Sequence, residues 1–307
     1  MAKEKVTPNR FNQISAGWNL AFTILLIGTS FFMLIPLVLV IIVSFSSEAS
    51  IAYKGFSFFP SEWSLAGYKY LMKMGDQVLD SYIITITHTI LGTLMSLAVM
   101  TLYAYVISLK NFKFRKFYTW ILFFTMLFSG GLVPAYIMNV RYLQIDNTLW
   151  IYLLPSLVSA YNVIILRTFI LSTIPDSLFE AARIDGAGHF RVFISIVLPL
   201  FKAGIATIAL FNVVNRWNDW FTGMLYIKDS KLIPLQTLLK NLQDNIDFLK
   251  QNAQIAGTPD GLELLDSLPD QNLRMSCTII VIVPILCAYP FFQRYFVQGL
   301  TLGSVKG

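Results

Sequence analysis

Long stretches without a charged side chain dominate this 307-residue sequence. They cover residues 20–43, 81–109, 117–140, 149–166 and 275–293. About 20 consecutive apolar residues are needed to cross the hydrocarbon core of a bilayer as a helix. A sixth stretch, residues 203–223, is apolar but is interrupted by Arg216 and Asp219. Each stretch is predicted to be helical, because an isolated strand in lipid leaves its backbone polar groups unpaired.

The small supply of charge supports this interpretation. Only 13% of the residues are Asp, Glu, Lys or Arg, which is about half the ~25% typical of soluble domains. We therefore predict an all-α polytopic membrane protein with a six-helix transmembrane domain over residues 18–298, flanked by termini at 1–17 and 299–307. The six transmembrane helices are predicted at about residues 18–45, 82–109, 117–138, 149–170, 203–223 and 275–295.

Basic residues predict the orientation. Lys3, Lys5 and Arg10 precede the first predicted span, and four more basic residues lie in the short loop 109–116. The positive-inside rule places these segments in the cytoplasm. With six spans, the loop 172–202 and both termini share that side, and the loop 224–274 lies outside. The net charge of +6 is then a consequence of topology, and no nucleic-acid partner is expected.

The loop 172–202 contains signals for two short helices. Pro175 suits the start of a helix, and Asp176 places negative charge in its first turn, where the helix dipole favours it. Glu180 and Arg183 are spaced for an intrahelical pair. Gly186 suits the left-handed position that ends a helix. A second helix is predicted over residues 189–198, with Pro199 introducing the bend into the fifth span.

The same loop carries a recognisable pattern. Its elements are Glu180, Ala181, Ala182, Gly186, Ile196, Leu198 and Pro199. This spacing resembles the Glu-Ala-Ala (EAA) signature of the permease subunits of ATP-binding-cassette importers. One departure is visible, because many sugar permeases have a further proline shortly after the Leu-Pro pair, whereas residues 200–203 here read Leu-Phe-Lys-Ala.

The resemblance is closest to the MalG-like permeases of carbohydrate importers. It rests on Asp185-Gly-Ala, Trp217-Asn-Asp and the segment 233–239. The segments 130–134 and 147–150 are similar to a subgroup associated with complex oligosaccharides. The resemblance implies a type I importer fold, in which this chain is a transport subunit of a bacterial cell membrane and not an enzyme.

Partners follow from the same resemblance. It implies a heterodimer with a second, homologous permease and two copies of a cytoplasmic ATPase, which binds the ATP and magnesium. It also implies an extracellular solute-binding protein or lipoprotein, a carbohydrate substrate and contact with membrane lipid. No cofactor, metal or catalytic residue is expected in this chain, which has no Gly-x-x-x-x-Gly-Lys-Ser/Thr phosphate loop. Coupling to the ATPase is implied for Glu180, Ala181, Ala182, Asp185, Gly186, Ile196, Leu198 and Pro199.

Polar and aromatic residues in the fourth and fifth predicted spans are candidates for a substrate path. They are Tyr161, Asn162, Asn212, Asn215, Arg216, Trp217, Asn218, Asp219 and Trp220. Polar side chains at membrane depth usually face the bundle interior or a cavity. A purely structural role stays open, with Arg216 paired to Asp219 and the tryptophans in the interfacial belt. For His88, a hydrogen bond that packs helices is expected.

The sequence leaves open the role of the outer loop, the cargo and the class of transporter. The outer loop 224–274 either contacts the binding protein or is a solvated linker. The cargo is an oligosaccharide, or instead a small sugar, a polyol or another solute. An ion-coupled secondary transporter is the remaining class, but it would use buried carboxylates, and the predicted spans other than the fifth contain none.

Overall fold

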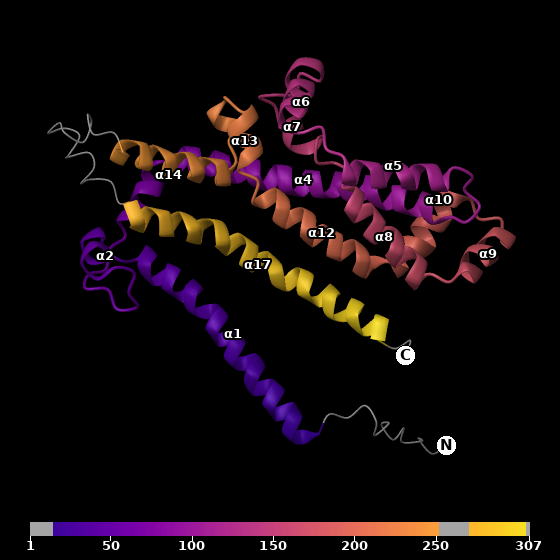
Figure 1. Ribbon diagram of the computed structural model, residues 1–307, viewed down its shortest axis with the longest axis horizontal. Helices are drawn as coiled ribbons and strands as arrows, with labels where there is room; N and C mark the ends of the chain where they lie inside the picture. Colours follow the sequence, from indigo (N-terminus) through magenta and orange to yellow (C-terminus); the bar gives the residue numbers. More distant parts are fainter. Residues whose placement is uncertain (1–14, 252–269, 305–307) are drawn as a thin grey trace. The chain divides into compact units, whose positions relative to one another are not determined.

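The computed structural model describes residues 15–251 and 270–304 (Figure 1). These residues are helical and form no strand, and one isolated bridge joins Ser46 to Trp63. The chain divides into two compact units. The smaller comprises Met1–Tyr70 and Pro269–Ile279, and the larger comprises Leu71–Leu268 and Ile280–Gly307. The predicted basic N-terminal segment and residues 252–269 of the predicted outer loop lie outside the described residues.

Helix α1 (Ala16–Ser44) and the short α2 (Glu48–Lys54) belong to the smaller unit. Apolar side chains on α1 are open to the surroundings, with Phe31, Phe32 and Met33 69–77% exposed. A water-facing helix of this length would not leave so wide an apolar surface uncovered. The surface of α1 is therefore one that lipid can cover.

Asn272 holds the smaller unit together. It lies near the start of α17 (Asp270–Ser304) and is fully buried. Its side-chain Nδ2 donates to the carbonyl oxygens of Ser44 and Ser46 at 2.8 and 2.7 Å. Its Oδ1 accepts from the backbone N–H of Gly67 at 2.6 Å. One side-chain amide therefore pairs backbone groups at the end of α1 and at the start of α3 (Ala66–Lys73).

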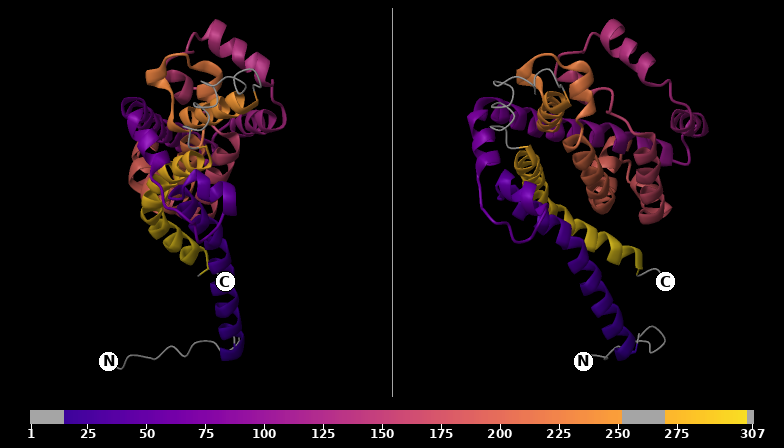
Figure 2. Two further views of the ribbon diagram at one scale, coloured as in Figure 1. Left: turned by 90° about the vertical axis from the view of Figure 1, so that its left-hand side faces the viewer. Right: turned by 60° about the vertical axis from the view of Figure 1, so that its left-hand side comes forward.

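Helix α4 (Gly75–Ser108) is the central element of the larger unit. α8 (Ala160–Thr173) and α12 (Lys202–Trp217) both pack on it and on each other (Figures 1 and 2). Their shared core contains Met100, Ala104, Val163, Leu166 and Ile208, all fully buried. α5 (Arg115–Leu127) packs against α4 and α8 as well.

Three of the six runs predicted as continuous helices are interrupted. The run 117–138 breaks between α5 and α6 (Leu132–Ile137), where Gly131 takes φ +84°. The run 149–170 breaks after α7 (Trp150–Leu153), because the residue before Pro155 is disfavoured in a helix. The run 203–223 ends with α12 and resumes as α13 (Phe221–Tyr226). Apolar length predicted these runs but did not reveal where they break.

Within the described residues, three helices are long and apolar enough to cross a membrane: α1, α4 and the Asp270–Pro290 part of α17. Bent helix pairs raise the total to as many as six. The pairs are Arg115–Leu127 with Leu132–Tyr142 (113°), Ala160–Thr173 with Asp176–Ile184 (77°), and His189–Leu200 with Lys202–Trp217 (80°). η2 (Met138–Tyr142) completes the first pair.

The remaining elements adjoin the predicted outer loop. η4 (Ser230–Leu232) leads into α14 (Leu235–Gln251). α17 begins at Asp270, five residues before the predicted sixth span, and continues to Ser304 in the predicted C-terminal tail.

We predict that Asn272→Ala destabilises the protein by about 3 kcal/mol, because each buried partner left unpaired costs roughly 1–3 kcal/mol. The thermal unfolding midpoint of the detergent-purified protein measures the effect. Asn245→Ala, at an exposed position of α14, is the matched control and should leave the midpoint unchanged. Equal midpoints for the two variants would show that the Asn272 contacts contribute no net stability.

Candidate functional site

The first candidate site is the helix that carries the Glu-Ala-Ala pattern, α9 (Asp176–Ile184). It begins directly after Pro175 and ends at Gly186, which takes φ +71°, as the sequence predicted. The N–H of Ala187 donates to Ala182 O at 2.9 Å, and the N–H of Gly186 donates to Arg183 O at 3.0 Å. These two bonds form a Schellman motif, which closes the helix and reverses the chain.

The second helix of the segment is less regular than predicted. α10 (His189–Val192) continues as the π-helical η3 (Phe193–Val197) and then as α11 (Leu198–Leu200). The sharp bend was predicted at Pro199, but it lies two residues later, between Leu200 and Lys202. Pro199 lies in α11, directly after the π-helical turn η3. Ile196 and Leu198 pack partly buried against the core of the larger unit.

The two faces of α9 differ. Ala182 is 6% exposed and joins the core, whereas Glu180, Ala181 and Asp185 are exposed. Ile184 of α9 and Phe190 of α10 are also exposed, at 87% and 71%. We call the surface formed by Leu178, Glu180, Ala181, Ile184 and Phe190 the docking face. It offers apolar contact area and one carboxylate, a composition that suits a protein partner.

Arg183 does not form the predicted ion pair with Glu180. Its guanidinium lies against the side chain of Asn111, whose amide oxygen accepts from Nη1 and Nη2 at 2.8 Å when oriented toward it. Arg183 therefore connects α9 to the loop after α4, and the Glu180 carboxylate is left on the exposed surface.

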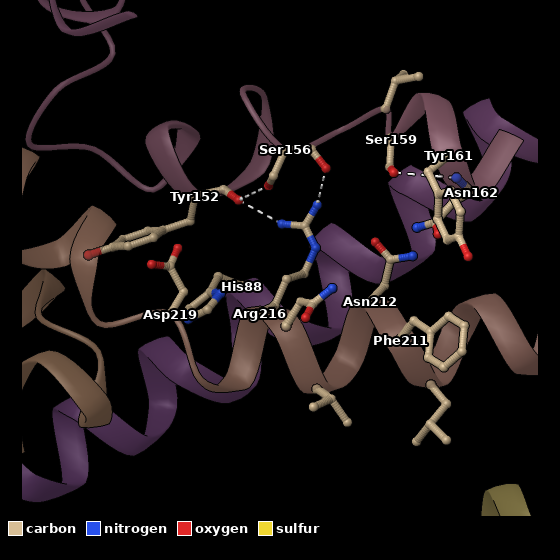
Figure 3. A pocket seen from close by; sticks show the side chains of 14 residues that line it. His88, Tyr152, Ser156, Ser159, Tyr161, Asn162, Phe211, Asn212, Arg216 and Asp219 are labelled. Atoms are coloured by element: carbon tan, nitrogen blue, oxygen red, sulfur yellow. Dashed lines mark hydrogen bonds between the residues drawn. The ribbon is translucent and has the colours of Figure 1, made fainter. Parts of the chain in front are cut away.

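The second candidate site is a pocket of about 780 Å³ between α4, the α7–α8 connection and α12 (Figure 3). Six of the nine residues predicted for a substrate path line it: Tyr161, Asn162, Asn212, Asn215, Arg216 and Asp219. Tyr161 and Phe211 offer aromatic surface, being 59% and 43% exposed. The pocket thus combines ring faces with amide groups.

Arg216 organises one wall of this pocket, although it is only 5% exposed. Its Nη1 donates to Tyr152 O at 2.6 Å, and its Nη2 donates to Ser156 O at 3.0 Å (Figure 3). Nη2 also donates to Ser96 Oγ at 2.8 Å. These acceptors are neutral. The ion pair with Asp219, which the sequence left open as an alternative, is not found among the described residues. Instead, Asp219 Oδ1 accepts from the backbone N–H of Thr222 at 3.0 Å and caps α13.

Gly92 makes room for this guanidinium. A Cβ atom added at Gly92 would meet Nη1, Cζ and Nε of Arg216 at distances that real contacts do not reach. The glycine is therefore required by the close approach of a side chain from α12 and not by its own backbone conformation.

The other three predicted path residues have structural contacts outside the pocket. The indole N–H of Trp217 donates to Val281 O at 3.2 Å. The amide oxygen of Asn218 accepts from Gln236 Nε2 at 3.0 Å. The backbone carbonyl of Trp220 accepts from Thr237 Oγ1 at 2.8 Å, and Lys240 lies over its ring. They join α12 and α13 to α14 and α17.

Several pocket residues were not identified as path residues from the sequence. They are His88, Tyr152, Ser156, Val158, Ser159, Leu210, Phe211 and Val214. The Leu-Pro at 154–155 was a usable signal, because a helix interrupted at membrane depth often lines a binding site. His88 was expected to pack by a hydrogen bond, but its ring stacks on Tyr152 at 4.9 Å, and its Nε2 finds no partner among the described residues.

No group of three or more His, Cys, Asp or Glu side chains in the described ranges is placed to hold a metal ion. The two sites are thus a polar, aromatic pocket in the helix bundle and an exposed helical face that follows a sharp turn. Neither contains an arrangement of side chains that would catalyse a reaction.

Residues 107–302 match the family of binding-protein-dependent transport system inner membrane components. The chain belongs to this family. It is therefore the membrane-embedded permease subunit of an ATP-binding-cassette importer, with the type I importer fold, and it is a transport subunit and not an enzyme. Members of the family work with an ATPase and a binding protein.

Two relatives and one solved structure extend the comparison. The chain is 33% identical to the polygalacturonan/rhamnogalacturonan transport system permease protein YtcP of Bacillus subtilis (strain 168), covering 97% of this chain and 98% of that protein. It is 35% identical to protein LplC of the same strain, covering 91% and 92%. A crystal structure of a bacterial transporter that imports the acidic polysaccharide alginate superposes with a TM-score of 0.75 at 28% identity, covering 91% and 96%.

We predict that Gly92→Ala in this permease displaces the Arg216 guanidinium and lowers substrate uptake about tenfold or more. A hydrogen bond to a charged group contributes roughly 1.5–3 kcal/mol, and about 1.4 kcal/mol already corresponds to a factor of ten. Uptake by the reconstituted importer measures the effect. Gly28→Ala in α1, where an added Cβ meets nothing within 4 Å, is the control. Wild-type uptake by Gly92→Ala would contradict the assigned role of Arg216.

Proposed function

We propose that this chain forms half of the membrane path of an oligosaccharide importer. A second, homologous permease supplies the other half, and two copies of a cytoplasmic ATPase bind the ATP and magnesium that drive transport. An extracellular solute-binding protein or lipoprotein delivers the sugar. The observation that carries this proposal is the pocket between α4, α8 and α12, in a chain that belongs to a family of importer permeases.

The cargo is proposed from the chemistry of the pocket. Sugars present hydroxyl groups and apolar C–H faces, which match amide groups and aromatic rings. Asn162, Asn212 and Asn215 supply the amides, while Tyr161 and Phe211 supply the rings. A volume of about 780 Å³ lies within the range of small-molecule sites, roughly 300–1,000 Å³. The relatives named for polygalacturonan, rhamnogalacturonan and alginate support an oligosaccharide.

The docking face is proposed as the contact with the ATPase. Glu180, Ala181 and Ile184 are exposed on it, while Ala182 anchors the same helix in the core. Asp185 and Gly186 end the helix, and Ile196, Leu198 and Pro199 carry the chain back into the bundle. A helix fixed on one side and open on the other can transmit the closing of an ATPase dimer as a rigid-body movement.

We propose that the docking face, the basic loop 109–116 and both termini are cytoplasmic. Lys110 in that loop forms an ion pair with Asp176 of α9. The loop therefore lies at the same end of α4 as α9, α10, η3 and α11, which we call the docking segment. The opposite end of α4 adjoins α14, which we propose to face the binding protein outside. The part of that outer loop over residues 252–269 lies outside the described residues.

A small sugar or a polyol is the second candidate cargo, since amide and aromatic groups bind single sugar rings as well. Uptake competition against a panel that runs from monosaccharides to oligosaccharides separates the two. Competition by oligosaccharides alone supports the proposal, while competition by a monosaccharide or polyol alone would replace the proposed cargo.

We predict that Glu180→Lys abolishes association with the ATPase and lowers uptake to below about a tenth of wild type, because the exposed carboxylate becomes a cation on the docking face. Co-purification of the ATPase and ATP-driven uptake in proteoliposomes measure the two effects. Asp76→Lys makes the same charge change at the exposed opposite end of α4 and should leave association intact. Association of the Glu180→Lys variant at wild-type level would contradict the docking role.

We predict that Tyr161→Ala lowers the maximal rate of oligosaccharide uptake roughly three- to tenfold, since loss of ring contact costs about 0.5–1.5 kcal/mol. Tyr142→Ala is the control, because Tyr142 is 74% exposed and lies outside the pocket. Uptake rates at saturating binding protein separate an effect in the membrane from one on delivery. Equal rates for both variants would remove Tyr161 from the path.

A further inference from the structure

We propose that α4 carries the movement of the docking segment to the pocket, and that Tyr105, Lys110 and Asn111 are the positioning residues that fasten α9 and α10 to its end. The inference rests on the proposed role of the docking face. It adds to that role a route through the protein and three residues outside the Glu-Ala-Ala pattern.

Tyr105 makes the firmest of these contacts. It lies in the last turn of α4 and is 3% exposed. Its ring packs against Phe179 of α9 and Phe193 of η3, with ring centroids 6.5 and 5.3 Å apart. Its hydroxyl donates to His189 O at 3.3 Å. One side chain of α4 therefore contacts both helical parts of the docking segment.

The loop directly after α4 adds two polar contacts. Lys110 forms an ion pair with Asp176 in the first turn of α9. With its amide oxygen oriented toward α9, Asn111 accepts from the guanidinium of Arg183, in the last turn of the same helix, at 2.8 Å. An exposed ion pair contributes little stability by itself. Contacts at both ends of α9 nevertheless fix the orientation of this helix relative to α4. A movement of α9 can then be passed on to α4.

The middle of α4 forms a wall of the pocket. Gly92 and Ser96 receive the guanidinium of Arg216, and His88 stacks on Tyr152. One turn further on, Met100 Sδ accepts from the N–H of Ser159 at 3.4 Å, at the end of the non-helical connection between α7 and α8. A shift of α4 therefore moves the residues that shape the pocket.

The opposite end of α4 reaches the segment proposed to lie outside. Thr85 Oγ1 accepts from the backbone N–H of Leu235 at 2.8 Å, where α14 begins. Both residues are buried. The same helix thus contacts the docking segment, the pocket and α14.

Helix α4 is long and unbroken, so it can move as one rigid element. It has 34 residues and no proline, which corresponds to a length of about 51 Å at 1.5 Å per residue. By contrast, the three bent helix pairs among the described residues bend by 77–113°, and all three belong to the larger unit. Sharp bends arise at identifiable breaks such as proline, and α4 has none, so it transmits displacement along its length better than the broken elements around it.

Charge reversal tests the fastening contacts. The importer is reconstituted in proteoliposomes with its second permease, ATPase and binding protein, and ATP hydrolysed per sugar imported is measured. We expect Lys110→Asp, Asp176→Lys and Asn111→Leu each to raise this ratio several-fold while the ATPase still co-purifies. The double variant Lys110→Asp/Asp176→Lys should return the ratio toward the wild-type value. Single variants with a wild-type ratio, or a double variant no better than either single variant, would overturn the proposal.

A crosslink tests whether the contact stays closed during transport. Cysteines are placed at 110 and 176 after the native Cys277 and Cys287 are replaced by serine. A short bismaleimide should then substitute for the lost ion pair and lower the ATP per sugar toward that of the cysteine-free parent. If the crosslink stops uptake, or if it leaves the ratio unchanged, α9 and α4 do not move together and the proposal fails.

The two proposals fail in different ways. If Glu180→Lys retains the ATPase, the docking role itself is wrong. If Glu180→Lys loses the ATPase while the Lys110 and Asn111 variants stay fully coupled, only the route through α4 is wrong. Variants at Lys110 or Asn111 that lose the ATPase would contradict the separation of docking from transmission.

Discussion

A broken helix can exist at membrane depth only if the carbonyl groups freed at the break find donors inside the protein. In this permease, Arg216 supplies them. Its guanidinium lies between α12 and the connection of α7 to α8, where it binds the carbonyl oxygens of Tyr152 and Ser156 and the hydroxyl of Ser96. This one side chain pairs the carbonyl groups at the break after α7, fills the space left by Gly92 and lines the pocket.

A buried cation is costly at this depth, and burial without a carboxylate partner needs compensation by other groups. The planar guanidinium is suited to this because it presents several donors in fixed directions. Lysine could not reach three acceptors on two elements in the same way. With Nη1 and Nη2 turned toward these oxygens, Arg216 shapes the wall of the pocket more than it offers charge to a solute. The amides and rings at the other side of the pocket are then the groups that we propose to bind a sugar.

Features that depend on neighbouring residues could be predicted from the sequence, whereas contacts between distant segments could not. Gly186 was placed correctly because the left-handed end of a helix leaves a local residue signal. The alternative in which Arg216 pairs with Asp219 is not what the structure shows, because proximity along a helix says nothing about acceptors that a distant segment brings in. Gly92 could not be assigned a role, since its partner lies more than a hundred positions away. Likewise, Trp217, Asn218 and Trp220 shared a motif with pocket residues but pack elsewhere.

The docking face and the pocket differ in the same way, and this difference matters for function. Most of the docking face lies on α9, whose two ends are set by Pro175 and Gly186, so it keeps its shape through local chemistry. The pocket has no such local cause, because its walls come from α4, the α7–α8 connection and α12. An importer needs a constant surface for its ATPase but a substrate site that can open and close. A pocket assembled across separate elements can change when one of them shifts, and α4 is the element that contacts both the pocket and the docking segment.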